Sequence, residues 1–323
     1  MKNNYLKAAL AALLLTALSA CGGGSVSGSA GTTQNQEGLQ TLRVGFVPAA
    51  SAGALQLGMD KGIFEKHGFK LELTQGTGGA ALLPAVTSGS LDIALGHPLA
   101  VLTAQDKGLD MSIVAGYGYS PEGRADSNGV VTKDASIQSA KDLADKTVSV
   151  NTIKGPGDLT IKEAVAKDGG DPNAVKFTEM PFSDAQAQLE RGNADAIWLS
   201  EPFLTNAVNS GLRIVTSPYG AALPGQSTQL VFTSSSWASS HGDVIKEFRA
   251  ALKETLTYAA EHEVELRAVL PTFIKMEKAT ADTVVIEDLD AQVHTDKLQK
   301  FAGLMTKYGY TASDVDVAAM VAD

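Results

Sequence analysis

Cysteine is nearly absent from this sequence, since Cys21 is the only one among 323 residues. A single chain therefore cannot form an internal disulfide. Long apolar runs are also scarce. The run from Ala8 to Leu18 follows Lys2 and Lys7 and is too short to cross a bilayer. No second run approaches the roughly 18 residues that indicate a membrane span. The sequence thus predicts a signal peptide and no transmembrane helix after it.

Basic residues are outnumbered by acidic ones, 26 to 36, which gives a formal net charge of −10. Cleavage of the signal peptide would remove Lys2 and Lys7 and leave 24 of the 26 basic residues. Nucleic-acid binding needs a basic surface, which an acidic chain of this kind does not provide. We therefore expect no nucleic-acid partner.

Motifs for cofactors and catalysis are incomplete. Gly76 to Ala81 formally fits the pattern G-x-G-x-x-A, but no acidic residue ends a following strand about 20 residues on. The dipeptide His262-Glu263 lacks the second His of a zinc helix, and the sequence has no Gly-Lys-Ser or Gly-Lys-Thr. Ser234 to Ser236 has no nucleophile-elbow pattern. We expect no catalytic residues, no metal and no cofactor.

The N-terminus carries a secretion signal with one distinctive residue. Leu18-Ser19-Ala20-Cys21 resembles a bacterial lipobox, in which the signal peptide is cut before a Cys that is then lipidated. The alternative is an ordinary secretory signal. Residues 1–20 are thus interpreted as a lipoprotein signal peptide, and residues 21–41, rich in Gly, Ser and Thr, as a flexible tether. This places the protein outside the cytoplasm, anchored to the cell membrane by a lipid on Cys21.

One stretch occurs twice in the remaining sequence, which begins near Leu42. Gly192 to Pro202 repeats the order of Gly89 to Pro98: a Gly, an Asp, a short apolar run, two further residues and a Pro. A Gly of this kind ends a helix, and the apolar run is typical of a buried strand. Because Pro cannot donate to a strand ladder, it places the strand end just before it. Two similar α/β halves with a cleft between them are predicted.

The predicted halves are two lobes. Residues 42–131 and 232–323 form the first lobe, and residues 132–231 form the second. The chain would cross between them near 131–136 and near 229–233. Beyond the last clear strand the chain is predicted to be helical, because Leu298, Phe301 and Met305 recur on one helix face.

Five short stretches carry a resemblance to a known family. They are Val44-Gly45-Phe46, Gly62-Ile63-Phe64-Glu65-Lys66-His67-Gly68, Gly89-Ser90-Leu91-Asp92-Ile93-Ala94, Asp142-Leu143-Ala144-Asp145-Lys146-Thr147-Val148 and Gly192-Asn193-Ala194-Asp195-Ala196. Their order and spacing, over about residues 42–235, resemble the sulfonate, nitrate and taurine family of ABC-transporter substrate-binding proteins. The related thiamine-pyrimidine precursor binders, of the NMT1/THI5-like type, share much of this pattern. The chain departs from many relatives at His97 and at Ser200-Glu201-Pro202.

The resemblance implies an α/β periplasmic-binding-protein fold of type II. Its features would be two parallel-dominated sheets, flanking helices and two hinge crossings. It also implies a monomer that closes on a small solute and delivers it to an ABC permease and ATPase complex, and that is not an enzyme. Two alternatives remain: a pyrimidine-synthesising enzyme of the same fold or a secreted hydrolase, and an adhesion or sensor lipoprotein.

Three loops at predicted helix starts contain small residues suited to an anion, because helix N-termini expose N–H groups and a partial positive charge. The alternative is that these residues only make tight turns. Lys154 would add a full positive charge. The anion-binding candidates are Ser51, Ala52, Thr77, Gly78, Gly79, Lys154, Gly155 and Gly157.

Three further candidates bear on the choice of solute. His97 and Glu201 close the two copies of the repeated stretch and are expected to face each other across the cleft, and Tyr117 would pack on the body of the solute. A buried carboxylate needs an N–H or cationic partner, so Glu201 is the candidate for an amine, amide or ring N–H. Asp158 is a second carboxylate near the predicted site, and its alternative explanation is that it favours a helix N-terminus. A sulfonate-, taurine- or nitrate-like anion is favoured, with a nitrogen-containing ring or an amine as the alternative.

Overall fold

The computed structural model describes residues 38–323. The predicted signal peptide, Cys21 and most of the predicted tether lie outside these residues. The first strand begins at Gln40, two residues before the expected start of the folded part. None of the described helices is long and apolar enough to cross a membrane.

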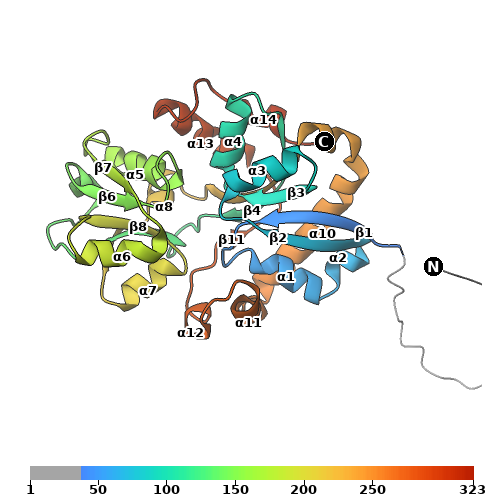
Figure 1. The fold of residues 1–323 in the computed structure, drawn as a ribbon, viewed down its shortest axis with the longest axis horizontal. Coiled ribbons are helices and arrows are strands. Elements are labelled where there is room, and N and C mark those ends of the chain that lie inside the picture. Colours follow the sequence, from blue (N-terminus) through green and yellow to red (C-terminus); the bar gives the residue numbers. More distant parts are fainter. Residues whose placement is uncertain (1–37) are drawn as a thin grey trace, which may run out of the picture. The chain divides into compact units, whose positions relative to one another are not determined.

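A six-stranded sheet with the order β11-β4-β10-β3-β1-β2 forms the first half of the fold (Figure 1). Strand β1 pairs in parallel with β2 and β3, whereas β10 runs antiparallel to β3 and β4, and β11 runs antiparallel to β4. The strands are β1 Gln40–Phe46, β2 Phe69–Gln75, β3 Ile93–Gly96, β4 Met111–Tyr119, β10 Ser227–Ser234 and β11 Asp288–Leu289.

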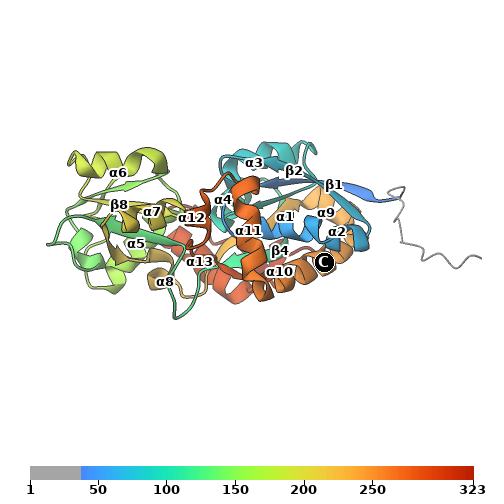
Figure 2. The same ribbon diagram turned by 90° about the horizontal axis from the view of Figure 1, so that it is seen from below.

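Helices cover both faces of this sheet, each over its own apolar core. Figure 2 shows β1 and β2 between α3 on one side and α1 and α10 on the other. One face carries α1 Gly53–Asp60, α2 Ile63–Lys66, α9 Ser235–Ser240, α10 Gly242–Glu261, α11 Glu263–Phe273 and α12 Lys278–Ala281. The other carries α3 Gly79–Thr87, α4 Pro98–Asp106, α13 Thr295–Lys307 and α14 Val317–Met320. The predicted helix face is confirmed, since Leu298, Phe301 and Met305 of α13 are buried.

A five-stranded sheet with the order β7-β6-β8-β5-β9 forms the second half. Its strands are β5 Asn128–Thr132, β6 Thr147–Val150, β7 Lys176–Glu179, β8 Ala196–Ser200 and β9 Arg213–Thr216. One face packs against the 3-10 helix η1 Ala140–Leu143, α5 Pro156–Lys167 and α8 Pro218–Ala222. The other packs against α6 Phe182–Glu190 and α7 Phe203–Asn209.

The predicted α/β fold with two sheets is confirmed, but the sheets are mixed rather than parallel-dominated. The cause is that β5 and β10 each follow a crossing of the chain and enter the other sheet antiparallel to β8 and β3. The crossings lie at 120–127 and 217–226, earlier than the expected 131–136 and 229–233, because β5 already belongs to the second sheet and β10 to the first. The division into two lobes is kept as a proposal with these boundaries.

In each sheet the Asp of the repeated stretch makes the same hydrogen bonds to the backbone of a neighbouring strand, an arrangement that we call the aspartate bracket. Gly89 and Gly192 adopt the left-handed conformation, with φ of 75° and 79°, as predicted for helix ends. The carboxylate of Asp92 accepts the N–H of Arg43 at 2.7 Å, and the N–H of Asp92 donates to the carbonyl of Arg43. Asp195 repeats both bonds with Thr147, the carboxylate accepting at 2.8 Å.

A Thr from the antiparallel neighbour completes each bracket. The hydroxyl of Thr233 donates to the carbonyl of Asp92, and that of Thr132 donates to the carbonyl of Asp195, both at 2.6 Å. Each Asp therefore ties together three strands of its sheet, which fixes the strand register in both halves.

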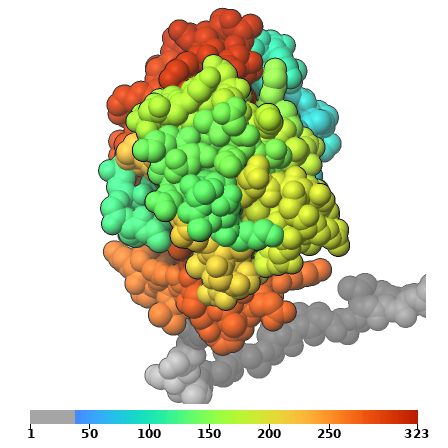
Figure 3. Space-filling model, turned by 90° about the vertical axis from the view of Figure 1, so that its left-hand side faces the viewer, coloured from blue at the N-terminus to red at the C-terminus, as the bar shows by residue number. Residues whose placement is uncertain are grey.

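The C-terminal part of the chain also contacts the second half. Nζ of Lys307 lies 2.6 Å from the carboxylate of Glu163 in α5, and the hydroxyl of Tyr308 donates to the same carboxylate at 2.8 Å. Figure 3, viewed from the side of the five-stranded sheet, shows this C-terminal part in red along the margin of the green and yellow half. The two halves are thus joined by these contacts as well as by the crossings.

Two helix glycines are predicted to respond to alanine in opposite directions. A Cβ at Gly157 would lie 2.6 Å from a ring carbon of Trp198, whereas a Cβ at Gly303 in α13 would meet nothing within 4 Å. Gly157→Ala should therefore lower the free energy of unfolding by about 1–3 kcal/mol through overpacking. Gly303→Ala should raise it by about 0.5–1 kcal/mol. Denaturant unfolding measures both changes, and a stabilised Gly157→Ala variant would contradict the packing role of Gly157.

Candidate functional site

The ends of the strands carry most of the side chains that the sequence predicts for a ligand site. In the first sheet, Ser51 comes after β1, Gly79 after β2 and His97 after β3. In the second sheet, Lys154 comes after β6 and Glu201 after β8. Ligands of open α/β sheets bind outside the carboxyl ends of the strands, so these positions define the candidate site.

Ser51 is held by three protein partners. Its hydroxyl donates to the carboxylate of Glu287 and accepts from Nε2 of Gln229 at 3.1 Å. Its carbonyl accepts from the hydroxyl of Tyr117 at 3.0 Å. Tyr117 is fully buried in the first core, and burial raises the pKa of its hydroxyl, so that it remains a donor. Ala52 is also buried and is the N-cap of α1.

The start of α5 is already bonded to a carboxylate of the protein. The N–H groups of Lys154 and Gly155 donate to the carboxylate of Asp158 at 2.9 and 2.8 Å. The Lys154 side chain is exposed, and Gly157 packs against the ring of Trp198. These contacts match the alternative explanation of Asp158 and Gly157, namely a helix cap and a tight packing position.

Small residues at the start of α3 allow two loops to pack closely against each other. Thr77 is exposed, Gly78 is the N-cap of α3, and the Cα of Gly79 is 3.1 Å from where a Cβ of Gly96 would lie. A Cβ at Gly79 would lie 3.2 Å from the Cβ of Ala100. The small residues thus bring the starts of α3 and α4 together. An anion-binding role for this loop remains a proposal.

His97 is the N-cap of α4, and its ring bears one unused nitrogen. Nδ1 accepts the N–H of Leu99 at 3.1 Å, whereas Nε2 is buried without a hydrogen-bond partner. The ring packs against Tyr219 and Phe301, with centroids 5.8 and 5.5 Å away. Burial lowers the pKa of His97 to about 3, so the imidazole is neutral at physiological pH.

Glu201 holds two backbone segments together. Its carboxylate accepts from the N–H and the hydroxyl of Thr205 at 3.0 and 2.8 Å, and from the N–H of Val285 at 3.2 Å. Burial raises its pKa, against the effect of these hydrogen bonds. His97 and Glu201 therefore have separate partners, and the expectation that they face each other across a cleft remains a prediction.

Sequence reasoning missed Asp126, which lies at the first crossing between the sheets. The residue is 5% exposed and accepts four hydrogen bonds. The donors are the hydroxyl of Ser120 at 2.8 Å, the N–H of Ser127 at 2.8 Å, the amide of Asn128 at 3.0 Å and the N–H of Gly220 at 3.2 Å. Asp126 thus fastens both crossings to each other with a buried negative charge.

Glu287, just before β11, was also missed. The residue is partly exposed, but its carboxylate lies against buried groups and accepts from Ser51. Its Oε2 and the hydroxyl oxygen of Thr228 both lie over Gly118, at 2.9 and 3.1 Å from where a Cβ would be. Only a glycine at 118 leaves space for these two polar atoms. The site therefore has a second carboxylate beside Asp126.

Several buried polar atoms around these carboxylates have no hydrogen-bond partner in the protein. They are the side-chain amide atoms of Gln226, the hydroxyl of Thr228, Oε1 of Gln229 and Nε2 of His97. Gln226, Thr228 and Gln229 are 0%, 3% and 7% exposed. A buried polar atom without a partner costs about 1–3 kcal/mol, so such a cluster is typical of a site that binds a polar molecule or water.

Aromatic rings connect the two halves next to this cluster. The Tyr219 ring lies between His97 and Trp198, with centroid distances of 5.8 and 6.0 Å, and Phe182 lies 5.5 Å beyond Trp198. Nε1 of Trp198 donates to the side chain of Asn128 at 3.4 Å. A ligand at the junction of the sheets would meet aromatic faces beside the carboxylates.

The two carboxylates lack a cationic partner. Within residues 38–323, no ion pair includes Asp126 or Glu287. Burial raises the pKa of both, and the charge of Asp126 raises that of Glu287 further. Arg124 acts in the opposite direction on Asp126, but its guanidinium is bound to Asp288.

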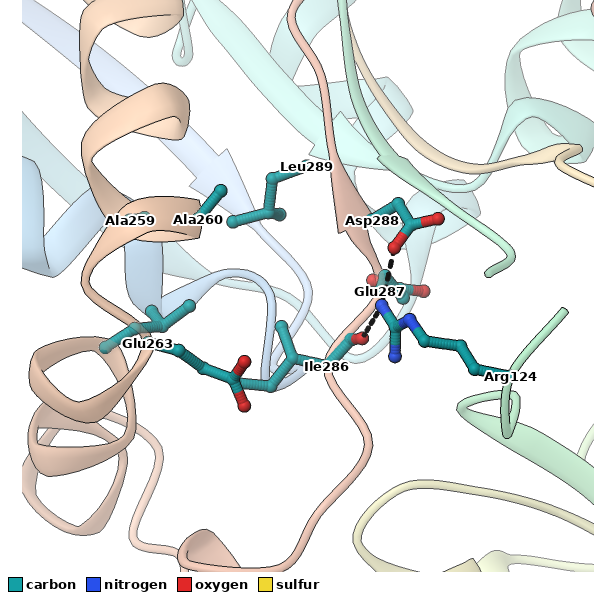
Figure 4. A pocket seen from close by; sticks show the side chains of 9 residues that line it. Arg124, Ala259, Ala260, Glu263, Ile286, Glu287, Asp288 and Leu289 are labelled. Atoms are coloured by element: carbon teal, nitrogen blue, oxygen red, sulfur yellow. Dashed lines mark hydrogen bonds and ion pairs between the residues drawn. The ribbon is translucent and has the colours of Figure 1, made fainter. Parts of the chain in front are cut away.

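An open pocket of about 260 Å³ adjoins Glu287 (Figure 4). Its other lining residues include Arg124, Glu263 and Leu266. Figure 4 shows Arg124 reaching toward Asp288 and the carbonyl of Ile286, to which it donates at 2.9 Å. The described part of the chain contains no group of three or more metal-binding side chains suited to a metal ion.

The signal that could have indicated the missed residues was weak. Asp126 stands in Asp126-Ser127-Asn128, three polar residues at the start of β5, and polar side chains at a strand end are common in ligand sites. Glu287 lies in a segment predicted to be helical, and only the short strand β11 brings it to Ser51, 236 positions earlier in the chain.

The raised pKa of Glu287 leads to a pH-dependent prediction. The folded protein keeps a proton on Glu287 at pH values where the unfolded chain, with a pKa near 4.5, has lost it. This stabilising effect is present below pH 4.5 and disappears as the pH rises through the folded-state pKa. Glu287→Gln should therefore raise the melting temperature of the unliganded protein, with a gain that grows from pH 4.5 to pH 8.

Asp288→Asn is the matched control for this measurement, because it makes the same charge change at the next residue. The Asp288 side chain is 51% exposed and paired with Arg124. Its substitution should not reproduce the pH-dependent gain. A Glu287→Gln variant less stable than the wild type at pH 8 would contradict the unfavourable burial of this carboxylate.

Comparison with known proteins places this chain in a family. A family model described as NMT1/THI5 like matches residues 52–266. A protein of Brachyspira hyodysenteriae, whose assigned name is ABC transporter periplasmic binding protein, is 23% identical over 299 residues, 88% of this chain and 81% of its own length.

Two solved structures are similar in fold. The periplasmic aliphatic sulphonate binding protein SsuA of Escherichia coli has a TM-score of 0.76 at 18% identity and covers 88% of this chain and 97% of its own. The periplasmic nitrate-binding protein NrtA of Synechocystis has a TM-score of 0.69 at 16% identity and covers 87% of this chain and 84% of its own. The chain has the periplasmic-binding-protein fold and belongs to the NMT1/THI5-like family.

Proposed function

We propose that the protein is the solute-binding component of an ABC importer. It would capture a small organic solute between its two halves and deliver it to a permease and ATPase complex as a monomer. The observation that carries this proposal is the partnerless polar cluster at the junction of the two sheets, where the strand ends of both halves meet. The family match and the assigned name of the Brachyspira relative support it.

The chemistry of the site favours binding over catalysis. His97 is the only His of the cluster, its Nδ1 is used as a helix cap, and its pKa of about 3 makes it a weak base at neutral pH. Asp126 already accepts four hydrogen bonds. These groups are arranged to hold a molecule rather than to transfer a proton.

Two classes of solute are suggested by the sequence. One is a small anion, as in the names of the Escherichia coli and Synechocystis structures, and the other is a nitrogen-containing ring or an amine. A thermal-shift screen of both classes identifies the solute, because a ligand at 100 times its dissociation constant stabilises the folded state by about 2.7 kcal/mol.

Solute capture should make the protein more compact. A solute shifts the equilibrium between open and closed forms only if it binds the closed form more tightly, and contacts such as Lys307 to Glu163 are available to the closed form. Small-angle scattering should show a smaller radius of gyration at saturation with a solute found in the screen. An unchanged radius at saturation would rule out hinge closure.

Membrane attachment is proposed to depend on Cys21. In a bacterial host, the wild-type protein should fractionate with membranes and incorporate labelled fatty acid, because lipidation needs the Cys thiol. Cys21→Ser should lose the label and leave the membrane fraction, while Ser25→Ala, four residues on, should behave like the wild type. A membrane-bound Cys21→Ser protein would show that another feature provides the anchor.

A further inference from the structure

The junction between the sheets combines negative charge with unused hydrogen-bond acceptors. Asp126 and Glu287 lie close enough that the charge of one raises the pKa of the other. The nearest cations are already paired: Arg124 with Asp288, and Lys297 with Glu122. Because these pairs occupy both side-chain cations, an ionised Glu287 is compensated only when a positively charged molecule binds.

The two carboxylates have different free capacity. Asp126 accepts four hydrogen bonds from neutral groups, so it contributes a fixed negative field rather than a direct contact. Glu287 accepts through Oε2 from Ser51 and, at 3.5 Å, from Gln229. Burial raises its pKa, against the effect of the nearby hydroxyls of Thr228 and Ser127. Glu287 also lines the open pocket of about 260 Å³, so it is the carboxylate that a ligand can reach.

Unpartnered atoms next to Glu287 point to a donor-rich ligand. The hydroxyl of Thr228 and Oε2 of Glu287 lie over the same Gly118, and Oε1 of Gln229 is buried without a donor. Gln229 uses its amide nitrogen toward Ser51, which leaves its oxygen to accept. A ligand that fits here supplies several N–H groups.

Three helix starts near the junction are already bonded to side chains of the protein, whereas α1 and α3 have no side-chain cap. The N–H groups of Lys154 and Gly155, directly before α5, donate to Asp158, the N–H of Thr205 in α7 donates to Glu201, and α4 is capped by His97. An anion would also be repelled by Asp126 and Glu287. The Tyr219 and Trp198 rings, by contrast, lie at the junction with centroids 6.0 Å apart, and aromatic rings attract cations.

We propose, on the basis of the function proposed above, that the solute is a small organic cation with several N–H donors, such as an ammonium, amidinium or guanidinium compound. Its charge lies against Glu287 in the field of Asp126, its N–H groups donate to Glu287, Gln229 and Thr228, and its body packs on Tyr219. The proposed solute is therefore positively charged, whereas the helix-start loops by themselves favour an anion.

Calorimetric titration of the full chain tests the sign of the charge. The cationic probes are benzamidine, methylguanidine and putrescine, and the anionic probes are methanesulfonate, nitrate and acetate. At least one cation should bind, and more tightly than every anion. An anion that binds more tightly than all the cations overturns the cation assignment and leaves solute capture intact. A panel in which no probe of either charge binds overturns both proposals.

Two variants locate the bound cation. Glu287→Gln should weaken binding by about tenfold or more, because it removes one partner of a charge-assisted contact while keeping its shape. Thr228→Val removes a hydroxyl beside Glu287 while keeping the size of the side chain, so it should weaken binding of the cation. Asp314→Asn, a charge change at an exposed residue, should bind like the wild type.

The variants distinguish a local contact with the cation from an effect of overall charge. Equal weakening by Glu287→Gln and Asp314→Asn would mean that only the overall charge matters, and it would overturn the assignment of Glu287. Unchanged cation binding in both Glu287→Gln and Thr228→Val would overturn the site itself. Loss of binding in Glu287→Gln, with the folded state at least as stable as the wild type at pH 7, supports the proposal.

Discussion

The aspartate brackets of the two sheets are the interactions on which the rest of the structure depends. Asp92 and Asp195 each bond the backbone of a parallel neighbour and receive a Thr hydroxyl from an antiparallel one. A slip of one residue would turn every side chain of a strand to the opposite face, so a bracket that fixes the register also fixes which residues reach the strand ends. The ligand-facing loops are positioned by these bonds before any contact with a solute forms.

The two halves share this bracket and differ in the residues that come directly after it. After β3 the chain places His97 as a helix cap with one unused nitrogen, and after β8 it places Glu201, whose carboxylate is fully engaged with Thr205 and Val285. One group of partnerless polar atoms lies at the junction near His97 and Gln229. Each of them destabilises the unliganded fold, which is expected where binding rather than stability has shaped the residues.

Local patterns in the sequence predicted the features that local physics determines. The glycines that end helices, the strands of the repeated stretch and the buried face of α13 follow from backbone conformation and apolar spacing, and the structure confirms them. The contacts of the site do not follow from such patterns, because Ser51 and Glu287 meet across 236 positions. The same limit applies to Asp158. A carboxylate near a helix start can be a helix cap or a ligand-binding group, and the sequence does not show which N–H groups donate to it.

The like charges at the junction also give a reason for closure to depend on the solute. Asp126 is fixed to the crossings by Ser120 and Gly220, whereas Glu287 is fixed to the first half by Ser51. With no cation between them, bringing these two carboxylates into a dry environment is unfavourable, so the closed form is penalised. The proposed cation would remove this repulsion only in the closed form, where it contacts Glu287 in the field of Asp126. The resulting difference in affinity between the two forms is the quantity that a solute needs in order to drive closure.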